Sequence, residues 1–250
     1  MRYFVKLSYR GTNYHGWQIQ PNGITVQEEL TKAFSLKLSE PELQITGAGR
    51  TDTGVHARNF YAHFDTKKPI IDLDDLVVQM NRFLSKDITI HQIFPVIDEA
   101  HARFDALSRT YRYFISTEKD PFFQDFSWYV YGSLNLEKMN QAAGYLIGKQ
   151  DFTSFSKLHT QTKTNICTVT KAVWTSTEGR LVFELTADRF LRNMVRAVVG
   201  TLVMVGRERI APEDVIEILQ AKSRSDAGES VPAKGLFLEE IDYDFERLRK

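Results

Sequence analysis

The chain lacks several features by which a protein is often classified. It contains one cysteine, Cys167, among 250 residues. A single thiol excludes an intrachain disulfide framework and a zinc cluster built on thiolates. No stretch reaches the roughly 18 consecutive apolar residues of a membrane-spanning helix. The opening residues, MRYFVKLSYR, also lack the apolar core of a signal peptide. We therefore expect a soluble cytoplasmic protein with no membrane association.

The chain also lacks an excess of either charge. Its 32 lysines and arginines balance 32 aspartates and glutamates. A neutral sum removes the usual argument for nucleic-acid binding from a high isoelectric point. It does not exclude a basic face, because binding depends on local patches. What the chain does have is 42% hydrophobic residues, enough for one large core or two small ones.

Residue periodicity predicts the order strand, helix, strand, strand, helix, strand in the first half of the chain. Alternating apolar residues predict the first strand. Thr25 and Glu28 form a capping box in front of an apolar helical face. The expected elements are strands at 2–9, 43–46, 55–65 and 88–95, and helices at 25–38 and 73–84.

The second half repeats this order without a visible sequence repeat. Asn135 is expected to cap a helix that Gly148 ends, and Pro212 is expected to begin an extra helix. The expected elements are strands at 107–116, 168–175, 180–187 and 236–243, and helices at 136–147, from position 189 and from position 212.

These elements predict an α+β fold. We expect two split β-α-β (ferredoxin-like) halves, residues 1–104 and 105–250, with mainly antiparallel sheets and a cleft between them for a ligand. Polar composition predicts surface loops at 117–127, 156–166 and 222–234. The last of these is expected to be mobile until something binds.

The stretch GAGRTDTGVHA, residues 47–57, contains an Asp-Thr-Gly triplet at Asp52 like that of an aspartic protease. Such a protease needs two carboxylates that share a proton, and the chain has no second triplet. A metal held by Asp52, His56 and His63 stays open. The glycines around Asp52 nevertheless indicate a turn, whereas its spacing from His56 suits a helix.

Two further explanations apply to the same stretch. Its glycine spacing fits neither a dinucleotide fingerprint nor a nucleotide P-loop. An aspartate in a glycine-rich turn often forms only an Asx-turn, and the triplet alone favours this structural explanation. Arg50 and Arg58 on either side favour a functional carboxylate, because a facing arginine keeps a carboxylate ionised. A carboxylate nucleophile requires that state.

Six blocks in order closely resemble the TruA family of tRNA pseudouridine synthases. The blocks are YRGTNYHGWQIQ (9–20), GAGRTDTGVHA (47–57), ARFDALSRTYRY (102–113), GKQDFTSF (148–155), RFLRNMVRAVVGTL (189–202) and PAKGLFLEEIDY (232–243). They span nearly the whole chain. Three residues depart from the family pattern: Ser85, Gln150 and Thr170 stand where the family usually has proline, histidine and arginine. None of them is a residue that we expect to be catalytic, although Thr170 could alter contacts with RNA.

The resemblance implies isomerisation of uridine to pseudouridine at positions 38, 39 and 40 of the tRNA anticodon stem-loop. It also implies a homodimer that needs no cofactor and no metal. Asp52 matches the catalytic aspartate, Arg196 the arginine that pairs with it, and Tyr111 the active-site tyrosine. Arg50 matches the arginine that takes the place of the extruded base, and Leu236 matches an apolar residue that packs on the flipped base.

The resemblance also suggests what each residue does. Asp52 attacks the ribose C1′ or the base C6, or removes a ribose proton, and the sequence does not choose among these. Arg196 is expected on a helix four residues after Arg192, so that both face the cleft, and it holds Asp52 ionised and aimed. Tyr111 stacks on the base, and its hydroxyl could assist proton removal from C5. Candidates for phosphate contacts are Arg10, Arg58, Arg109, Arg112, Lys157, Arg189 and Arg192.

Two functions of other classes stay open. A non-catalytic RNA-binding module of the same fold would tolerate Asp52→Ala. An N-glycoside hydrolase using Asp52 would release free uracil, whereas the isomerase releases nothing. Each residue also has an ordinary structural explanation: a solvated helical arginine, a core tyrosine or a buried strand leucine.

Overall fold

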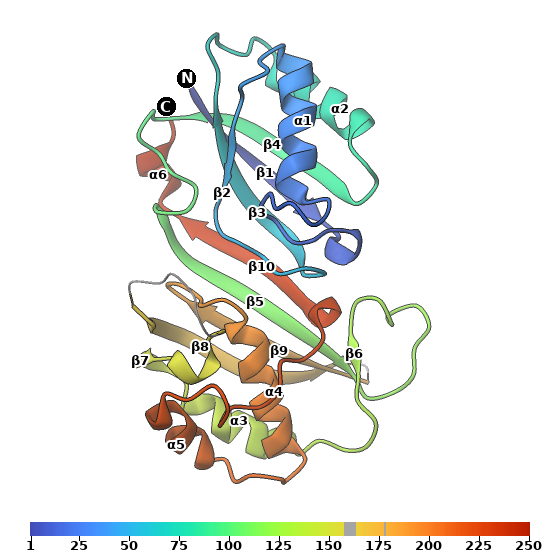
Figure 1. Ribbon diagram of the computed structural model, residues 1–250, viewed down its shortest axis with the longest axis vertical. Coiled ribbons are helices and arrows are strands. Elements are labelled where there is room, and N and C mark those ends of the chain that lie inside the picture. The colour runs from blue at the N-terminus through green and yellow to red at the C-terminus, as the bar shows by residue number, and fades with distance from the viewer. Residues whose placement is uncertain (158–163, 178) are drawn as a thin grey trace. The chain divides into compact units, whose positions relative to one another are not determined.

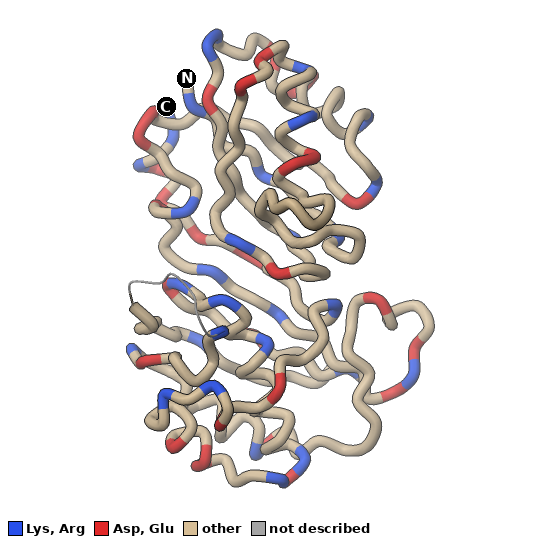
Figure 2. Tube along the Cα trace, viewed as in Figure 1, with Lys and Arg blue, Asp and Glu red and all other residues tan. Residues whose placement is uncertain are grey.

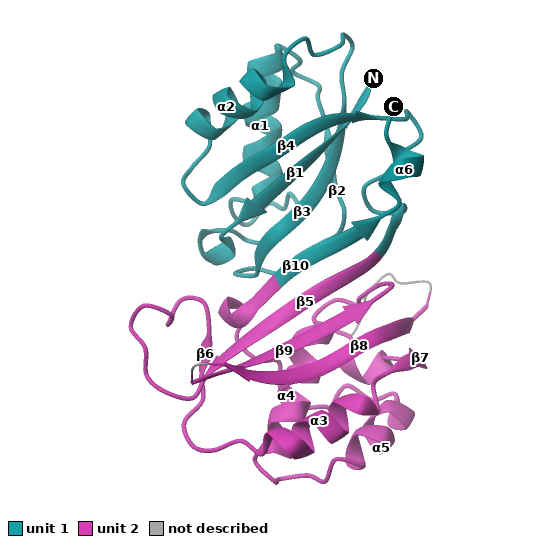
Figure 3. Ribbon diagram, turned by 180° about the vertical axis from the view of Figure 1, so that it is seen from behind, with its two compact units in different colours: residues 1–107, 238–250 teal, residues 108–237 magenta. Residues whose placement is uncertain are grey.

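The chain forms two compact units. The structure is a computed structural model that describes residues 1–157, 164–177 and 179–250 (Figure 1). Unit 1 comprises Met1–Leu107 and Leu238–Lys250, and unit 2 comprises Ser108–Phe237 (Figure 3). Residues 238–250 therefore belong with unit 1, whereas the sequence assigned them to the second half. The predicted loop at 156–166 lies partly outside the described residues.

Unit 1 has the predicted order of elements. They are β1 (Arg2–Tyr9), α1 (Val26–Leu38), β2 (Ile45–Gly47), β3 (His56–Asp65), α2 (Leu73–Phe83) and β4 (Ile88–Val96), with short helices η1 (Gly11–Asn13) and α6 (Phe245–Leu248). β1 pairs antiparallel with both β3 and β4, and β2 pairs antiparallel with β3. Helices α1 and α2 cover one face of this sheet (Figures 1 and 3). The unit is therefore a split β-α-β structure, as predicted.

The two longer helices of unit 1, α1 and α2, each begin at a capping side chain. The Thr25 hydroxyl accepts a hydrogen bond from the Glu28 amide at 3.3 Å, which confirms the predicted cap. The Glu28 carboxylate accepts a hydrogen bond from Lys32, one turn along the helix, at 2.7 Å. Asp72 caps α2 in the same way as Thr25 caps α1, by accepting from the Asp75 amide at 2.8 Å. This second cap was not predicted from the sequence.

Aromatic rings fill the core of unit 1. Phe34 of α1 lies 4.6 Å from Phe64 of β3, centroid to centroid. Trp17, from the loop after β1, stacks on Phe60 at 4.1 Å and is 2% exposed. Such pairs stabilise a fold by about 0.5–1.5 kcal/mol each beyond their burial. The Trp17 ring thus fixes the loop after β1 to the sheet.

Unit 2 is also α+β. It contains β5 (Ala106–Ser116), β6 (Trp128–Tyr129), α3 (Leu136–Gly144), β7 (Gly148–Asp151), β8 (Ile166–Thr177), β9 (Arg180–Ala187), α4 (Met194–Gly206) and α5 (Asp214–Ala221), and the chain continues into β10 (Leu236–Tyr243). Strands β5, β9, β8 and β7 pair antiparallel in that order, and β6 pairs parallel with β5. Helix α3 packs against α4 and against β8. The predicted α+β class is confirmed.

Three boundaries in unit 2 differ from the predictions. Helix α3 ends at Gly144, and Gly148, with φ +105°, begins the unpredicted strand β7. Helix α4 begins at Met194 instead of position 189, because Asn193 has a left-handed backbone with φ 68°. Helix α5 begins at Asp214, after a turn that contains Pro212.

The two longest helices each have 13 residues. Within the described residues, no helix is both long and apolar enough to cross a membrane.

Candidate functional site

Asp52 lies in a tight turn between β2 and β3. Its carbonyl accepts a hydrogen bond from the Val55 amide at 3.1 Å, which closes a four-residue turn. Gly54, the third residue of this turn, has φ +79°. A turn with positive φ at its third position favours glycine there. The Asp-Thr-Gly triplet is therefore the sequence of this turn, and Asp52 is its half-buried first residue.

The loop after β1 presses directly on the Asp52 turn. A Cβ atom on Gly11 would lie 1.9 Å from the Val55 carbonyl oxygen. A Cβ atom on Gly16, whose φ is +85°, would lie 2.3 Å from the Thr51 carbonyl oxygen. No side chain fits at such distances, so only glycine permits the two backbones to approach this closely. The first two blocks of the family signature therefore form one packed unit.

Hydrogen bonds hold the same two segments together. The Thr51 hydroxyl is 2.9 Å from the Tyr9 hydroxyl, and the Thr51 carbonyl accepts from the Trp17 amide at 3.4 Å. The Gly54 amide donates to the Tyr14 carbonyl at 3.3 Å. Both sides of Asp52 are thus fixed to the buried end of β1 and its following loop.

The two histidines named with Asp52 as candidate metal ligands accept hydrogen bonds from backbone amides. His56 Nδ1 accepts from the Gly11 amide at 3.1 Å, and His63 Nδ1 accepts from the Ala102 amide at 3.1 Å. Burial lowers the pKa of His63 to about 4, with the nearby Arg2 charge adding to the effect. Among the residues that the structure describes, no group of three His, Cys, Asp or Glu side chains is arranged to hold a metal ion.

The two arginines that flank Asp52 in the sequence are exposed. Arg50 lies in the loop before Asp52. Arg58 lies in β3, with its Nε 3.5 Å from a carboxylate oxygen of Glu239. The side chain of Arg58 is 57% exposed, and such exposed pairs contribute little to stability.

Tyr111 lies in β5 of unit 2. It pairs with Leu185 of β9, and its half-buried ring lies 5.0 Å from that of Phe190 in an edge-on contact. Tyr113 is two residues further along β5, so both rings lie on the same face of the strand. The Tyr113 hydroxyl donates to the Pro232 carbonyl at 2.8 Å. Burial raises the pKa of Tyr113, against an opposing effect of the nearby Arg196 charge.

Arg196 lies in the first turn of α4. Its Nε donates to the Val231 carbonyl at 2.6 Å, and the Val231 amide donates back to the Arg196 carbonyl at 3.3 Å. The neighbouring Val195 and Val198 are buried, as expected for an arginine in an apolar setting. The prediction that Arg192 shares a helix face with Arg196 is wrong, because α4 begins only at Met194.

The other predicted binding residues of unit 2 lie in strands β5 and β10 and in the loop before α4. Leu236 is 5% exposed and is the first residue of β10. A Cβ atom on the preceding Gly235 would lie 2.8 Å from Tyr113 Cζ, so this strand start is packed on the Tyr113 ring. Arg109 donates to the Asp188 carbonyl at 2.8 Å. Arg192 is exposed, and its carbonyl accepts from the Lys157 amide at 3.0 Å.

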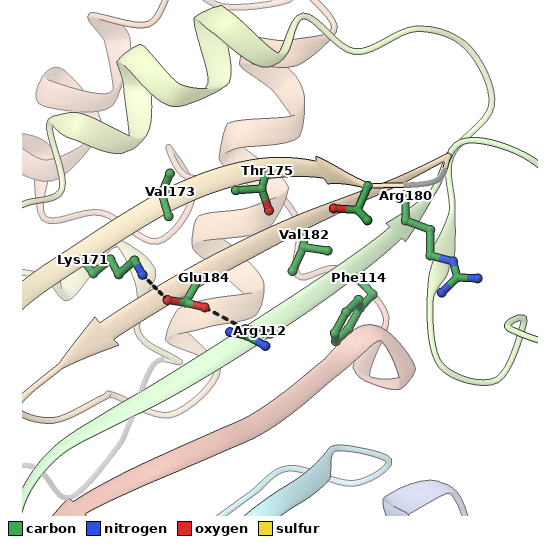
Figure 4. Close-up of a pocket in the computed structure, with 9 residues that line it drawn as sticks. Arg112, Phe114, Lys171, Val173, Thr175, Arg180, Val182 and Glu184 are labelled. Carbon is green, nitrogen blue, oxygen red and sulfur yellow. Dashed lines mark hydrogen bonds and ion pairs between the residues drawn. The ribbon is translucent and has the colours of Figure 1, made fainter.

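A groove of about 410 Å³ lies on one face of β5, β8 and β9 (Figure 4). Arg112 and Lys171 both pair with the carboxylate of Glu184 in this groove. Burial opposes ionisation of Glu184, but the hydrogen bonds from Lys171 and Arg112 outweigh it and lower the pKa of this carboxyl. Asp52, Tyr111 and Arg196 are not among the residues that line the groove. Arg112, a predicted phosphate contact, is thus paired with a carboxylate.

The segment 222–234, which is expected from its polar composition to be mobile, makes hydrogen bonds within itself and to α4. Arg224 donates to two backbone carbonyls and a hydroxyl within the segment. The Gly228 amide donates to the buried Thr201 hydroxyl of α4 at 2.8 Å. Arg224 was not predicted, because composition does not distinguish an arginine with backbone partners from a solvated one. The neighbouring Gly228 was the available signal of a close backbone approach.

Charges of both signs are interspersed along both units, in keeping with equal numbers of basic and acidic residues (Figure 2).

The contacts described above define two clusters, one within each unit. One is the Asp52 turn with the loop after β1 in unit 1. The other surrounds Arg196 in unit 2, where the segment before β10 meets α4 and Tyr113.

The chain is similar in sequence to known proteins. A family described as "tRNA pseudouridine synthase" matches residues 142–244. The chain is 51% identical over 242 residues to tRNA pseudouridine synthase A of Parabacteroides distasonis, covering 97% of this chain and 96% of the relative. It is 50% identical to that of Bacteroides thetaiotaomicron, over 97% of this chain and 90% of the relative.

A more distant relative covers the chain equally well. The chain is 39% identical to tRNA pseudouridine synthase A of Bacillus subtilis, over 98% of this chain and 100% of the relative. Among solved structures, a chain titled "Crystal Structure of a Cbf5-Nop10-Gar1 Complex" has a TM-score of 0.38 at 12% identity, over 80% of this chain and 45% of that chain. On the full-length identities, the chain belongs to the TruA family of tRNA pseudouridine synthases, isomerases that convert uridine in tRNA to pseudouridine.

Proposed function

We propose that the chain acts on uridines 38, 39 and 40 of the tRNA anticodon stem-loop, as a homodimer in the cytoplasm. The positions, the homodimer and the cytoplasm rest on the resemblance to the family, and the observation that supports catalysis by Asp52 is the turn in which it lies. The family signature stretch forms a tight turn that is fixed on both sides by the loop after β1. A fixed turn holds a carboxylate in one position, which is what a reacting aspartate requires.

Asp52 is the proposed catalytic residue. The reaction breaks the bond between N1 and the ribose C1′, turns the base, and joins C1′ to C5. The proton on C5 leaves, and N1 gains one, so nothing is released overall. Asp52 attacks C1′ or C6, or removes a ribose proton. Each of these roles needs an ionised carboxylate at a fixed position.

Arg196 and Tyr111 are proposed to act with Asp52. Arg196 would hold the carboxylate ionised and aimed, because an arginine fork binds a carboxylate with defined geometry. The fixed Nε of Arg196, bound to the Val231 carbonyl at 2.6 Å, supports a positioned guanidinium. Tyr111 would stack on the target base, and its half-buried ring suits a residue that contacts a base on one side.

The remaining predicted residues are proposed to bind the RNA. Arg50 would take the place of the extruded uridine, and Leu236 would pack on its base. Arg58, Arg109 and Arg192 would contact phosphates, since cations along the backbone supply salt-dependent affinity for RNA. The exposure of Arg50 and Arg192 supports these roles.

The test uses a transcript of an anticodon stem-loop with uridines at these positions. The purified chain is expected to convert them to pseudouridine, and Asp52→Asn is expected to lose at least about a thousandfold in rate, as when a reacting group is removed. Asp74→Asn, an exposed carboxylate in α2, is the matched control and is expected to keep the wild-type rate. Conversion by Asp52→Asn, after deamidation is ruled out, would contradict the assignment. Release of free uracil would instead indicate a glycoside hydrolase.

A further inference from the structure

Arg224 closes the segment that follows α5. Its Nη1 donates to the carbonyls of Ala227 and Gly228 at 3.2 and 3.0 Å, and its Nη2 donates to the Ser230 hydroxyl at 3.0 Å. One half-buried guanidinium therefore binds three acceptors within seven residues of chain. A planar fork of donors suits this pattern, and a lysine ammonium does not reproduce it.

The closed segment lies directly on the backbone of α4. The Gly228 amide donates to Thr201 Oγ1 at 2.8 Å, and this hydroxyl donates to the Ala197 carbonyl at 3.0 Å. A Cβ atom on Gly228 would lie 2.7 Å from the Gly200 carbonyl carbon, and one on Gly200 would lie 1.9 Å from the Glu229 carbonyl oxygen. The segment thus has one position on the helix, about one turn beyond Arg196.

The same segment then reaches Arg196 itself. Ser230, which Arg224 binds, also accepts a hydrogen bond from Asn193, the residue before α4. The next residue, Val231, exchanges two hydrogen bonds with Arg196: its amide donates to the Arg196 carbonyl, and its carbonyl accepts from Arg196 Nε. Binding Nε fixes the plane of a guanidinium and hence the direction of its two terminal nitrogens.

We propose that Arg224 is a positioning residue for the pseudouridylation reaction, acting through the Val231 carbonyl to orient the guanidinium of Arg196. This inference rests on the proposed role of Arg196 in aiming the catalytic carboxylate. Arg224 shapes the segment, the segment places Val231, and Val231 fixes Arg196. Without the fork of Arg224, the carbonyls of Ala227 and Gly228 lose this donor, and the Ser230 hydroxyl keeps only Asn193 among the donors that the structure describes. The stretch between the Gly228 contact with α4 and Val231 is then held less firmly.

The test is a double-mutant cycle on single-turnover pseudouridine formation in the anticodon stem-loop. Arg224→Ala is expected to lower the rate at saturating RNA by about 10- to 100-fold, because a displacement of about 1 Å in a reacting constellation has an effect of this size. The KM for RNA is expected to stay within about threefold, because no phosphate contact is removed. Arg196→Lys, which keeps the charge but loses the fork, is expected to lower the rate at least as much.

When Arg224→Ala is added to Arg196→Lys, the further loss of rate is expected to be less than about threefold. The two effects are not additive, because residues that act as a unit lose the same function only once. Arg209→Ala, an exposed arginine after α4, is the matched control. If thermal unfolding shows that Arg224→Ala is not folded, Arg224→Lys is measured in its place. Arg224→Lys retains the charge, and a partial loss of rate is expected.

The outcomes separate the two proposals. A wild-type rate for Arg196→Lys would mean that the proposed role of its guanidinium is wrong. A slow Arg196→Lys together with a wild-type rate for the folded Arg224 variant would overturn the positioning role of Arg224 alone. An equal loss from Arg224→Ala in both backgrounds, or a change in KM only, would overturn it as well.

Discussion

The close approach of Gly16 to the Asp52 turn leads to a quantitative prediction for Gly16→Ala. Gly16 has φ +85°, a left-handed conformation that costs an alanine about 1–2 kcal/mol. The new Cβ atom would lie 2.3 Å from the Thr51 carbonyl oxygen. Ordinary contact begins near 3.5 Å, so the two backbones must separate by about 1 Å.

This separation moves the residue next to Asp52. A shift of about 1 Å at a reacting group costs about 100-fold in rate. We therefore expect Gly16→Ala to lower single-turnover pseudouridine formation by about two orders of magnitude. The free energy of unfolding, measured by denaturant titration, is expected to fall by about 2–3 kcal/mol from backbone strain and repacking.

Gly144→Ala is the matched control for this experiment. Gly144 ends α3, its φ is not positive, and a Cβ atom there would meet nothing within 4 Å. The same change of residue type is therefore expected to leave rate and stability close to those of the wild type. If Gly16→Ala matched the wild type in both measurements, the loop after β1 would not determine the position of Asp52.

Two further predictions concern buried titratable groups. The pKa of His63 is about 4 in the folded protein against 6.5 ordinarily, so unfolding takes up a proton between these values. The stability that neutral His63 contributes is complete above pH 6.5, and the free energy of unfolding falls by about 2 kcal/mol between pH 7 and pH 5. Denaturant titrations at both pH values should show a smaller fall in this free energy for His63→Gln than for the wild type. An equal fall in the two proteins would contradict the prediction. Burial raises the pKa of Cys167 to about 12. At pH 8, iodoacetamide should therefore alkylate this thiol about a thousandfold more slowly in the native protein than in the unfolded protein. Equal rates would refute the burial of Cys167.

The sequence predicted those elements in which apolar residues recur along one face only. Strand β1 and helix α1 were found close to their true limits, because each buries one face and Thr25 marks the start of the helix. Strand β7 was missed because its residues, Gly148–Asp151, are polar and pair only along β8. The start of α4 was placed too early, because apolar periodicity does not reveal the left-handed backbone of Asn193.

The sequence supplies candidate residues for the site but does not supply the contacts that hold them in place. Glycine content placed Asp52 in a turn, and the resemblance assigned its role. The contacts of Gly11 and Gly16 with that turn join segments about 40 residues apart, which no local pattern encodes. Arg224 was overlooked for a similar reason, because the acceptors it binds are mostly backbone carbonyls, which every residue type carries.

The central claim is that Asp52 catalyses pseudouridine formation at positions 38–40 of tRNA. The most direct measurement maps pseudouridine in tRNA from cells that lack this chain and are complemented with either the wild type or Asp52→Asn at equal protein level. We predict pseudouridine at these positions with the wild type, and unmodified uridine with the variant. Pseudouridine restored by Asp52→Asn, or unchanged modification in cells without the chain, would contradict the account.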